Sequence, residues 1–252
     1  MICTMELLAE KAFMKNRIKS GVDSTASCFI AGGFKKLEEE VTVMDKILNT
    51  ASYGICVFSL EVLQDFLKKK RVRSKKLLEK FQKDREFYLD AQREGIWIPF
   101  AQINSIGYVI KLDGYDAPFD DAWELKMEYD GFNIEIKDGL WISSTGSFYT
   151  FNANEYGGDE GTYKMPYGII HYYSGTDRSY QTLDGNRLYT DFKYDVPSGK
   201  YLLSIKGYTR KQALERPNSN YGFFFSLVKV DAFDGFKNPR DEAYDFNVAH
   251  MG

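Results

Sequence analysis

Histidine is scarce in this sequence, and its scarcity argues against several kinds of catalytic site. The 252 residues include only His171 and His250. A serine or cysteine hydrolase would have to use His171, in the strand-like segment "IIHYY", and no nucleophile-elbow motif accompanies it. Zinc sites need Cys and His at short spacings, which are also missing. We therefore expect no catalytic residues, no metal and no cofactor.

Cysteines and long apolar runs are equally sparse. Cys3, Cys28 and Cys56 are odd in number and widely spaced, which favours reduced, buried thiols over a disulfide framework. No apolar run approaches the roughly eighteen residues that a membrane helix needs. Glu6 and Glu10 interrupt the stretch in which a signal peptide would be continuously apolar. These features predict a cytoplasmic protein that does not contact a membrane.

Phosphate-binding loops are absent as well, since "IAGGF" and "YGGDEG" lack the residues of the known glycine-rich motifs. One segment, residues 68–76, carries seven Lys or Arg and could contact nucleic-acid phosphates. No aromatic stacking residues are interleaved with it, and the chain as a whole has a net charge of −3. We favour a solvated junction between two helices, so nucleic acid is not an expected partner.

The first part of the chain, residues 1–95, has mostly helical periodicity. Apolar residues recur at helical spacing in the segments 5–19, 34–49, 61–70 and 75–95, and "YGICVFSL" reads as one short buried strand. Ser74 is a candidate N-cap for the last helix, and Gly95 is placed to end it. A boundary near residues 93–97 is expected.

Aromatic residues are abundant, with 19 Phe and 18 Tyr, and after Gly95 the apolar period becomes that of β-strands. "AWELKMEY" and "FNIEIKDG" alternate strictly and are joined by Asp130-Gly131, a favoured hairpin turn. With "LWISS" and "SFYTFNA" they predict a four-stranded meander. "YDVPSGKYLLSIKGY" predicts a second hairpin, with Tyr201, Leu203 and Ile205 in the core. The fold class expected is α+β, with an antiparallel β-sandwich or partly closed barrel of roughly eight to ten strands over residues 96–252.

Charge differs between the two parts, and this suggests a binding surface. Residues 1–100 hold 18 basic and 14 acidic residues (+4), whereas residues 101–252 hold 15 and 22 (−7). Two loops, "GYDAPFDDAW" and "EYGGDEGTY", combine carboxylates with aromatic residues, a mixture that suits a basic protein partner. The candidate contact residues are Asp116, Asp120, Asp121, Trp123, Glu155, Asp159 and Glu160.

Other readings of these loops remain open. The carboxylates could bind Ca²⁺ or flank a glycosidic bond, but Asp and Gly are also common turn residues, which is the reading we favour. Aromatic rings beside carboxylates also suit sugars, so a carbohydrate-binding or carbohydrate-cleaving β-sandwich is the alternative function, with Trp123 as a stacking candidate.

Residues 96–250 resemble a known class of small bacterial proteins. "DVPSGKYLLSIKGY", "GFNIEIKDGLWIS" and "YGFFFSLVKVDAF" are similar in pattern to segments of competence-associated nuclease inhibitors and of immunity proteins from toxin-delivery systems. The resemblance implies a cytoplasmic, non-enzymatic protein that binds a cognate toxin, often a basic nuclease domain, and covers its active site. It transfers no individual functional residue.

Overall fold

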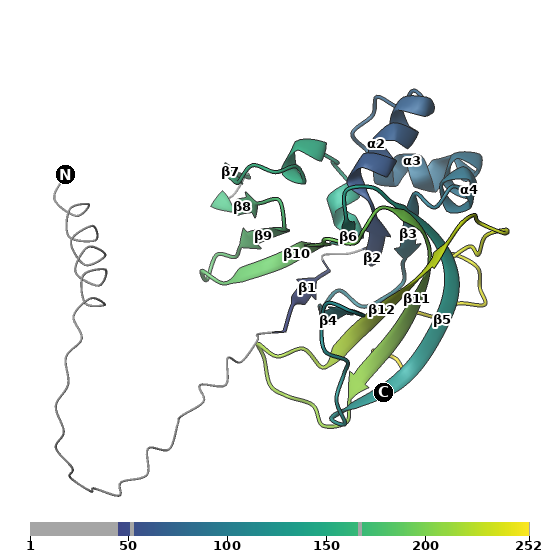
Figure 1. The fold of residues 1–252 in the computed structure, drawn as a ribbon. Helices are drawn as coiled ribbons and strands as arrows, with labels where there is room; N and C mark the ends of the chain where they lie inside the picture. The colour runs from purple at the N-terminus through teal and green to yellow at the C-terminus, as the bar shows by residue number, and fades with distance from the viewer. Residues whose placement is uncertain (1–44, 51–52, 166–167, 252) are drawn as a thin grey trace, which may run out of the picture. The chain divides into compact units, whose positions relative to one another are not determined.

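The computed structural model describes residues 45–50, 53–165 and 168–251 (Figure 1). Met44–Gly252 form one compact unit, so the boundary expected near residues 93–97 falls inside it. The predicted helix over 5–19 and most of the one over 34–49 lie outside the described residues. The end of the latter, Ile47–Asn49, is strand β1 rather than helix. Over the described part, the α+β class is confirmed, with three α-helices, two 3-10 helices and twelve strands.

A single sheet contains all twelve strands, and it curls into a nearly closed, barrel-like shape (Figure 1). Around the barrel the order is β3-β2-β6-β10-β1-β4-β12-β11-β5. The two ends of this path meet: the backbone N of Glu135, in β5, donates to the carbonyl of Gly95, just before β3, at 2.7 Å. Of the two predicted architectures, the observed sheet is closer to the partly closed barrel. It is not purely antiparallel, because β1 pairs with β10 and β4 with β12 in parallel, and it includes two strands from before residue 96. The strands are β2 (Ile55–Phe58), β3 (Trp97–Phe100), β4 (Gly107–Leu112), β5 (Trp123–Ile136), β6 (Leu140–Ser144), β10 (Arg187–Tyr194), β11 (Gly199–Arg210) and β12 (Tyr221–Val230).

Strand β10 is a branch point of the sheet. One of its edges pairs with β6 and, in parallel, with β1; the other pairs with β9 (Asp177–Gln181). β8 (Ile170–Tyr173) and β7 (Gly161–Lys164) follow β9 outward. In Figure 1 these three strands, together with β10, form a small lobe beside the barrel, the β7–β10 lobe.

The hairpin predicted at Asp130-Gly131 is wrong. Residues 123–136 form one long strand, β5, which pairs with β11 along its length. Asp130 and Gly131 together lie opposite Ser204, which makes them a β-bulge, and the φ of Gly131 is +77°. A glycine at positive φ suits a bulge as well as a turn, and only the pairing with β11 distinguishes the two. The four-stranded meander is also absent from these segments: β6 pairs with β2 and β10. The segment "SFYTFNA" (147–153) contains no strand, and its first two residues belong to a 3-10 helix, Thr145–Phe148.

The second predicted hairpin is also wrong, although its core residues are right. β10 and β11, on either side of Pro197-Ser198-Gly199, do not pair with each other in the described sheet. The turn instead carries the chain from β10 across to the β12–β5 side of the barrel. Tyr201 and Leu203 are buried, as the alternation predicts.

Strands β2, β3 and β6 have both faces buried. Their inward side chains, such as Val57 and Ile142, join the barrel core, whereas Phe58, Trp97 and Trp141 point outward into a second core. Three helices cover this outer face: α2 (Leu60–Lys69), α3 (Leu77–Lys83) and α4 (Arg85–Arg93). The second core is aromatic, with Phe81 stacked on Trp97 at 4.2 Å between ring centroids.

The single helix predicted over 75–95 is two helices. It breaks at Asp84, whose Oδ1 accepts a hydrogen bond from the Phe87 backbone N at 3.0 Å and so caps α4. Gly95 ends α4 as predicted, with φ +69°. Ser74 is not the N-cap, because α3 begins at Leu77 after Lys76.

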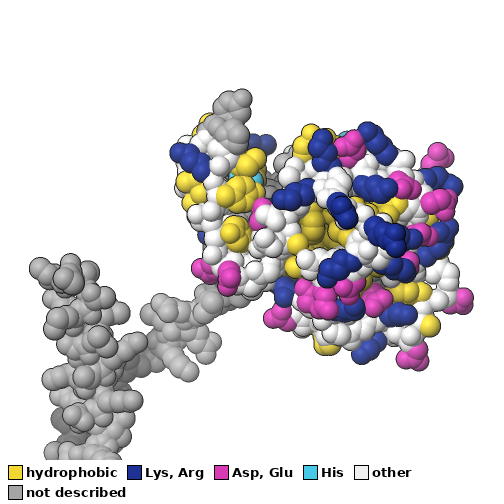
Figure 2. Space-filling view, turned by 90° about the horizontal axis from the view of Figure 1, so that it is seen from above, with side chains coloured by type: hydrophobic (Ala, Val, Ile, Leu, Met, Phe, Trp, Pro, Cys, Tyr) yellow, Lys and Arg dark blue, Asp and Glu magenta, His cyan; other side chains and the backbone are white. Residues whose placement is uncertain are grey.

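The basic run lies at the α2–α3 junction. Figure 2, which looks onto the helical end of the molecule, shows Lys and Arg side chains there with acidic side chains between them. Lys69 pairs with Glu94 at 2.8 Å and Lys70 with Asp90 at 2.5 Å, which neutralises part of the run. Within the described ranges, no helix has the length and hydropathy required to cross a bilayer.

Substitutions at Ser74 and Asp84 give a direct test of where α3 and α4 begin. Asp84→Ala removes the observed cap of α4, so the midpoint of thermal unfolding should fall by about 2–4 °C. Asp84→Asn should retain most of the stability, because Asn caps helices about as well as Asp. Ser74→Ala should leave the midpoint unchanged; an equal loss at Ser74 would contradict the observed helix boundaries.

Candidate functional site

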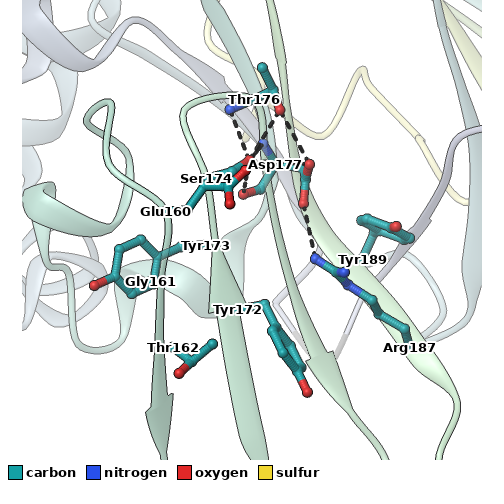
Figure 3. Close-up of a pocket in the computed structure, with 10 residues that line it drawn as sticks. All are labelled: Glu160, Gly161, Thr162, Tyr172, Tyr173, Ser174, Thr176, Asp177, Arg187 and Tyr189. Carbon is teal, nitrogen blue, oxygen red and sulfur yellow. Dashed lines mark hydrogen bonds and ion pairs between the residues drawn. The ribbon is translucent and has the colours of Figure 1, made fainter. Parts of the chain in front are cut away.

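A polar, aromatic cavity of about 550 Å³ opens on the β7–β10 lobe (Figure 3). Tyr172 of β8 and Tyr189 of β10 contribute rings from one face of the sheet. Tyr173 also belongs to the lining, but its ring lies on the other face of β8, directly over Gly161 of β7. A Cβ at residue 161 would come within 2.1 Å of the Tyr173 hydroxyl, so this close approach requires glycine.

Arg187 is the fixed cation of this cavity. Its Nε donates to the Ser179 Oγ at 2.6 Å, and its Nη2 lies 3.6 Å from Asp177 Oδ1. Its guanidinium also lies over the rings of Tyr172 and Tyr189, at 4.8 and 5.3 Å from their centroids. These contacts hold the guanidinium in one orientation although 47% of the side chain is exposed.

Asp177 is held from the opposite side by the β8–β9 turn. Its Oδ2 accepts hydrogen bonds from Ser174 Oγ at 3.2 Å and Thr176 Oγ1 at 3.3 Å. Its Oδ1 is buried beneath Arg187 and has no hydrogen-bond partner among the described residues. The carboxylate therefore serves to orient Arg187 and to balance its charge. Glu160, which is exposed, adds a second carboxylate to the lining.

A buried ionic network joins β9, β10 and the loop before β7. Arg178 and Asp191 lie on neighbouring strands with side chains 10% and 0% exposed, and Arg178 Nη1 lies 3.2 Å from Asp191 Oδ2. Arg178 also pairs with Glu155 and donates to the Tyr156 hydroxyl at 2.8 Å. Tyr156 in turn donates to Asp191 Oδ1 at 3.1 Å, and Thr190 Oγ1 donates to Oδ2 at 2.6 Å.

The electrostatics of this network keep Arg178 and Tyr156 in their bonding forms. Burial would by itself lower the pKa of Arg178, but Tyr156, Asp191 and Glu155 raise it overall, so the guanidinium stays charged. Burial, and then Asp191, raise the pKa of Tyr156, so its hydroxyl stays protonated and can donate. The network attaches the loop containing Glu155 and Tyr156 to the strands that carry the cavity.

His171 lies on β8 as predicted, in a stack of rings. Its ring centroid is 4.9 Å from that of Tyr163 and 5.7 Å from that of Tyr180, on the two neighbouring strands. Burial, followed by the charge of Arg178, lowers the pKa of His171 below 6.5. The imidazole is therefore neutral at pH 7 and serves as a packing element.

Cys56 is the one cysteine among the described residues. Cys56 is fully buried, and burial raises the pKa of its thiol to about 12, so it is not a thiolate at neutral pH. Cys3 and Cys28 lie outside the described residues. Within the described ranges, no three His, Cys, Asp or Glu side chains are grouped closely enough to hold a metal ion.

The seven residues predicted as partner contacts are divided between two loops. Asp116 and Trp123 have structural roles: Asp116 accepts from the Leu112 backbone N at 2.9 Å, and Trp123 is 7% exposed beneath Arg210. Glu155 is taken up by its pair with Arg178. Four residues remain exposed, namely Asp120 and Asp121 between β4 and β5, and Asp159 and Glu160 before β7.

Of the residues that line the cavity, the sequence singled out only Glu160. Tyr172, Asp177, Arg187 and Tyr189 lie in segments with a strand pattern, where alternating polar residues are expected to face solvent. The available signal was the presence of charges within strands, as at Asp177 and Arg187.

The chain matches no protein-family model, and no curated protein or solved structure is significantly similar to it.

The two arginines of β9 and β10 should differ strongly in their effect on stability. Arg178→Ala leaves Asp191 buried without its cation, so the free energy of unfolding should fall by about 3–5 kcal/mol. Arg187→Ala removes an exposed guanidinium and should cost less than about 1 kcal/mol. Urea unfolding of the two variants measures both values, and similar losses would contradict the assigned roles.

The neutral state of His171 predicts a pH dependence. Its pKa is lower in the folded than in the unfolded chain, so the unfolded state binds more protons as the pH falls through about 6.5. Stability should therefore fall as the pH is lowered from 7 to 5. His171→Phe keeps a stacking ring but cannot titrate, so its stability should fall less steeply. Parallel curves for the two proteins would rule out this contribution.

Proposed function

We propose that this chain is a non-enzymatic binding protein of the immunity or inhibitor type, which covers the active site of a basic protein partner. The partner class that we favour is a toxin with a nuclease domain. A nuclease cleft binds a polyanion and is therefore basic, so an acidic surface can occupy it and exclude the substrate.

The observation that carries this proposal is an exposed acidic surface at the β4–β5 connection. Asp113, Asp120 and Asp121 are exposed and make no ion pair with any described residue. Tyr115 of the same connection is 47% exposed, and Leu125, two residues into β5, is 45% exposed. Unpaired carboxylates beside large exposed side chains provide both electrostatic attraction and contact area.

The scaffold holds this surface rigidly. Phe119 packs between Trp123 and Tyr208, with ring centroids at 4.5 and 4.6 Å, and the Tyr115 hydroxyl donates to the Asp195 carbonyl at 2.7 Å. The connection is therefore fixed at both of its halves. A fixed loop loses little conformational entropy when it binds, which favours affinity.

Charge reversal of the exposed pair tests the proposal. Asp120→Lys/Asp121→Lys should reduce the association rate with the partner about tenfold or more at low salt, because it replaces attraction by repulsion. The partner would first be captured from a lysate of the source organism and identified by mass spectrometry. The association rate and the inhibition of the partner's activity would then be measured with purified proteins.

The matched control is Asp231→Lys/Asp234→Lys, which makes the same change in net charge at two exposed positions after β12. It should alter the rate much less than the reversal at residues 120 and 121. Equal effects of the two double variants on the association rate would show that only net charge matters, which would contradict the assignment of the contact site to residues 120 and 121. A captured protein whose activity is not inhibited would refute the inhibitor function.

A further inference from the structure

We infer that the cavity on the β7–β10 lobe is a binding site for a neutral saccharide of one or two rings. This site is separate from the acidic surface at the β4–β5 connection, so the inference goes beyond the inhibitor function. Its volume of about 550 Å³ lies in the range of small-molecule sites.

The charges of the lining favour a neutral ligand. Asp177 lies against Arg187 and balances its charge, and Glu160 adds one exposed carboxylate. An anionic ligand that approached Arg187 would meet both carboxylates, and a cationic ligand would meet Arg187 itself. A sugar hydroxyl both donates and accepts hydrogen bonds, so it can pair with a carboxylate and a guanidinium in the same site.

The polar groups are fixed before any ligand binds. The Nε of Arg187 donates a hydrogen bond to the Ser179 Oγ, and its Nη2 lies toward Asp177. Its Nη1 makes no hydrogen bond to a described residue. In Figure 3 the Arg187 side chain lies beside Tyr172 and Tyr189, with Asp177 at its guanidinium end. A donor that is already oriented costs little ordering on binding. Thr162 and Thr176 add exposed hydroxyls to the lining.

The aromatic rings provide the apolar part of a sugar site. Tyr172 is held in place by a hydrogen bond from its hydroxyl to Gln181 Oε1 at 3.2 Å, and Tyr189 stacks on Phe192 at 5.4 Å. Tyr173 points to the opposite face of β8, toward Tyr163, so its ring is not part of this set. Tyrosine combines a large apolar ring with a polar end, which matches the C–H faces and hydroxyl edges of a sugar ring. Trp123, the stacking residue suggested by the sequence, is buried elsewhere.

The test is a titration of the full chain with a defined panel of neutral sugars: glucose, galactose, mannose, N-acetylglucosamine, maltose and cellobiose. Binding would be followed by saturation-transfer NMR and isothermal calorimetry, and affinities in the millimolar range are expected for such a small open site. Tyr172→Ala and Arg187→Ala should each weaken binding by about tenfold or more.

Tyr180→Ala is the matched control. Tyr180 belongs to the same lobe but stacks on His171, on the opposite face of the sheet from Tyr172. It should change the affinity by less than about twofold. Thermal unfolding of each variant confirms that it is folded, and Tyr172→Phe, which keeps the ring, provides a milder second variant.

Three results would overturn the inference: no binding of any sugar in the panel, equal loss of binding in Tyr180→Ala, or binding of inorganic phosphate or free arginine in preference to the sugars. The inhibitor function is tested separately, because Asp120→Lys/Asp121→Lys should leave sugar binding unchanged. Failure of one proposal therefore leaves the other standing.

Discussion

Burial of both faces of strands β2, β3 and β6 is the constraint on which the rest of the structure depends. The inward faces of these strands complete the barrel core, and their outward faces carry Phe58, Trp97 and Trp141. Such large apolar area is stable only when it is covered. The three helices between β2 and β3 provide that cover, which places the basic α2–α3 junction at one end of the molecule, away from the β4–β5 connection (Figure 1).

Strand β10 connects the lobe to the barrel. It is paired to the barrel on one edge and to β9 on the other, so the position of the cavity follows from the position of the barrel. The buried pair of Arg178 and Asp191 joins β9 to β10, and Arg178 also pairs with Glu155, which holds the loop before β7 against these strands. On the other face of the same strands, Asp177 and Arg187 line the cavity. Alternation along two strands thus separates a structural ion pair from the ion pair of the proposed sugar site.

The two proposed binding surfaces use charge in different ways. At the β4–β5 connection, unpaired carboxylates create a field that acts beyond contact distance, which suits recognition of a protein of opposite charge. In the cavity, Asp177 and Arg187 largely cancel each other, so recognition depends on short-range hydrogen bonds and ring contacts. A protein partner and a small neutral ligand could therefore be bound by one chain through different parts of its structure.

Local pattern determined the strands β2, β6, β8, β10, β11 and β12, the helix α2, the end of α4 at Gly95 and the burial of Leu203, because periodicity and turn residues act over a few neighbours. Pairing was decided by tertiary structure. Asp130-Gly131 suits a hairpin turn and a bulge equally well, and only its long-range partner β11 makes it a bulge. Likewise, Glu155 and Asp120 are both loop carboxylates, yet Glu155 is partly buried against Arg178 and Asp120 is exposed, since burial depends on residues distant in the chain. The cavity needed the same information, because its side chains come from four strands that only the folded sheet brings together.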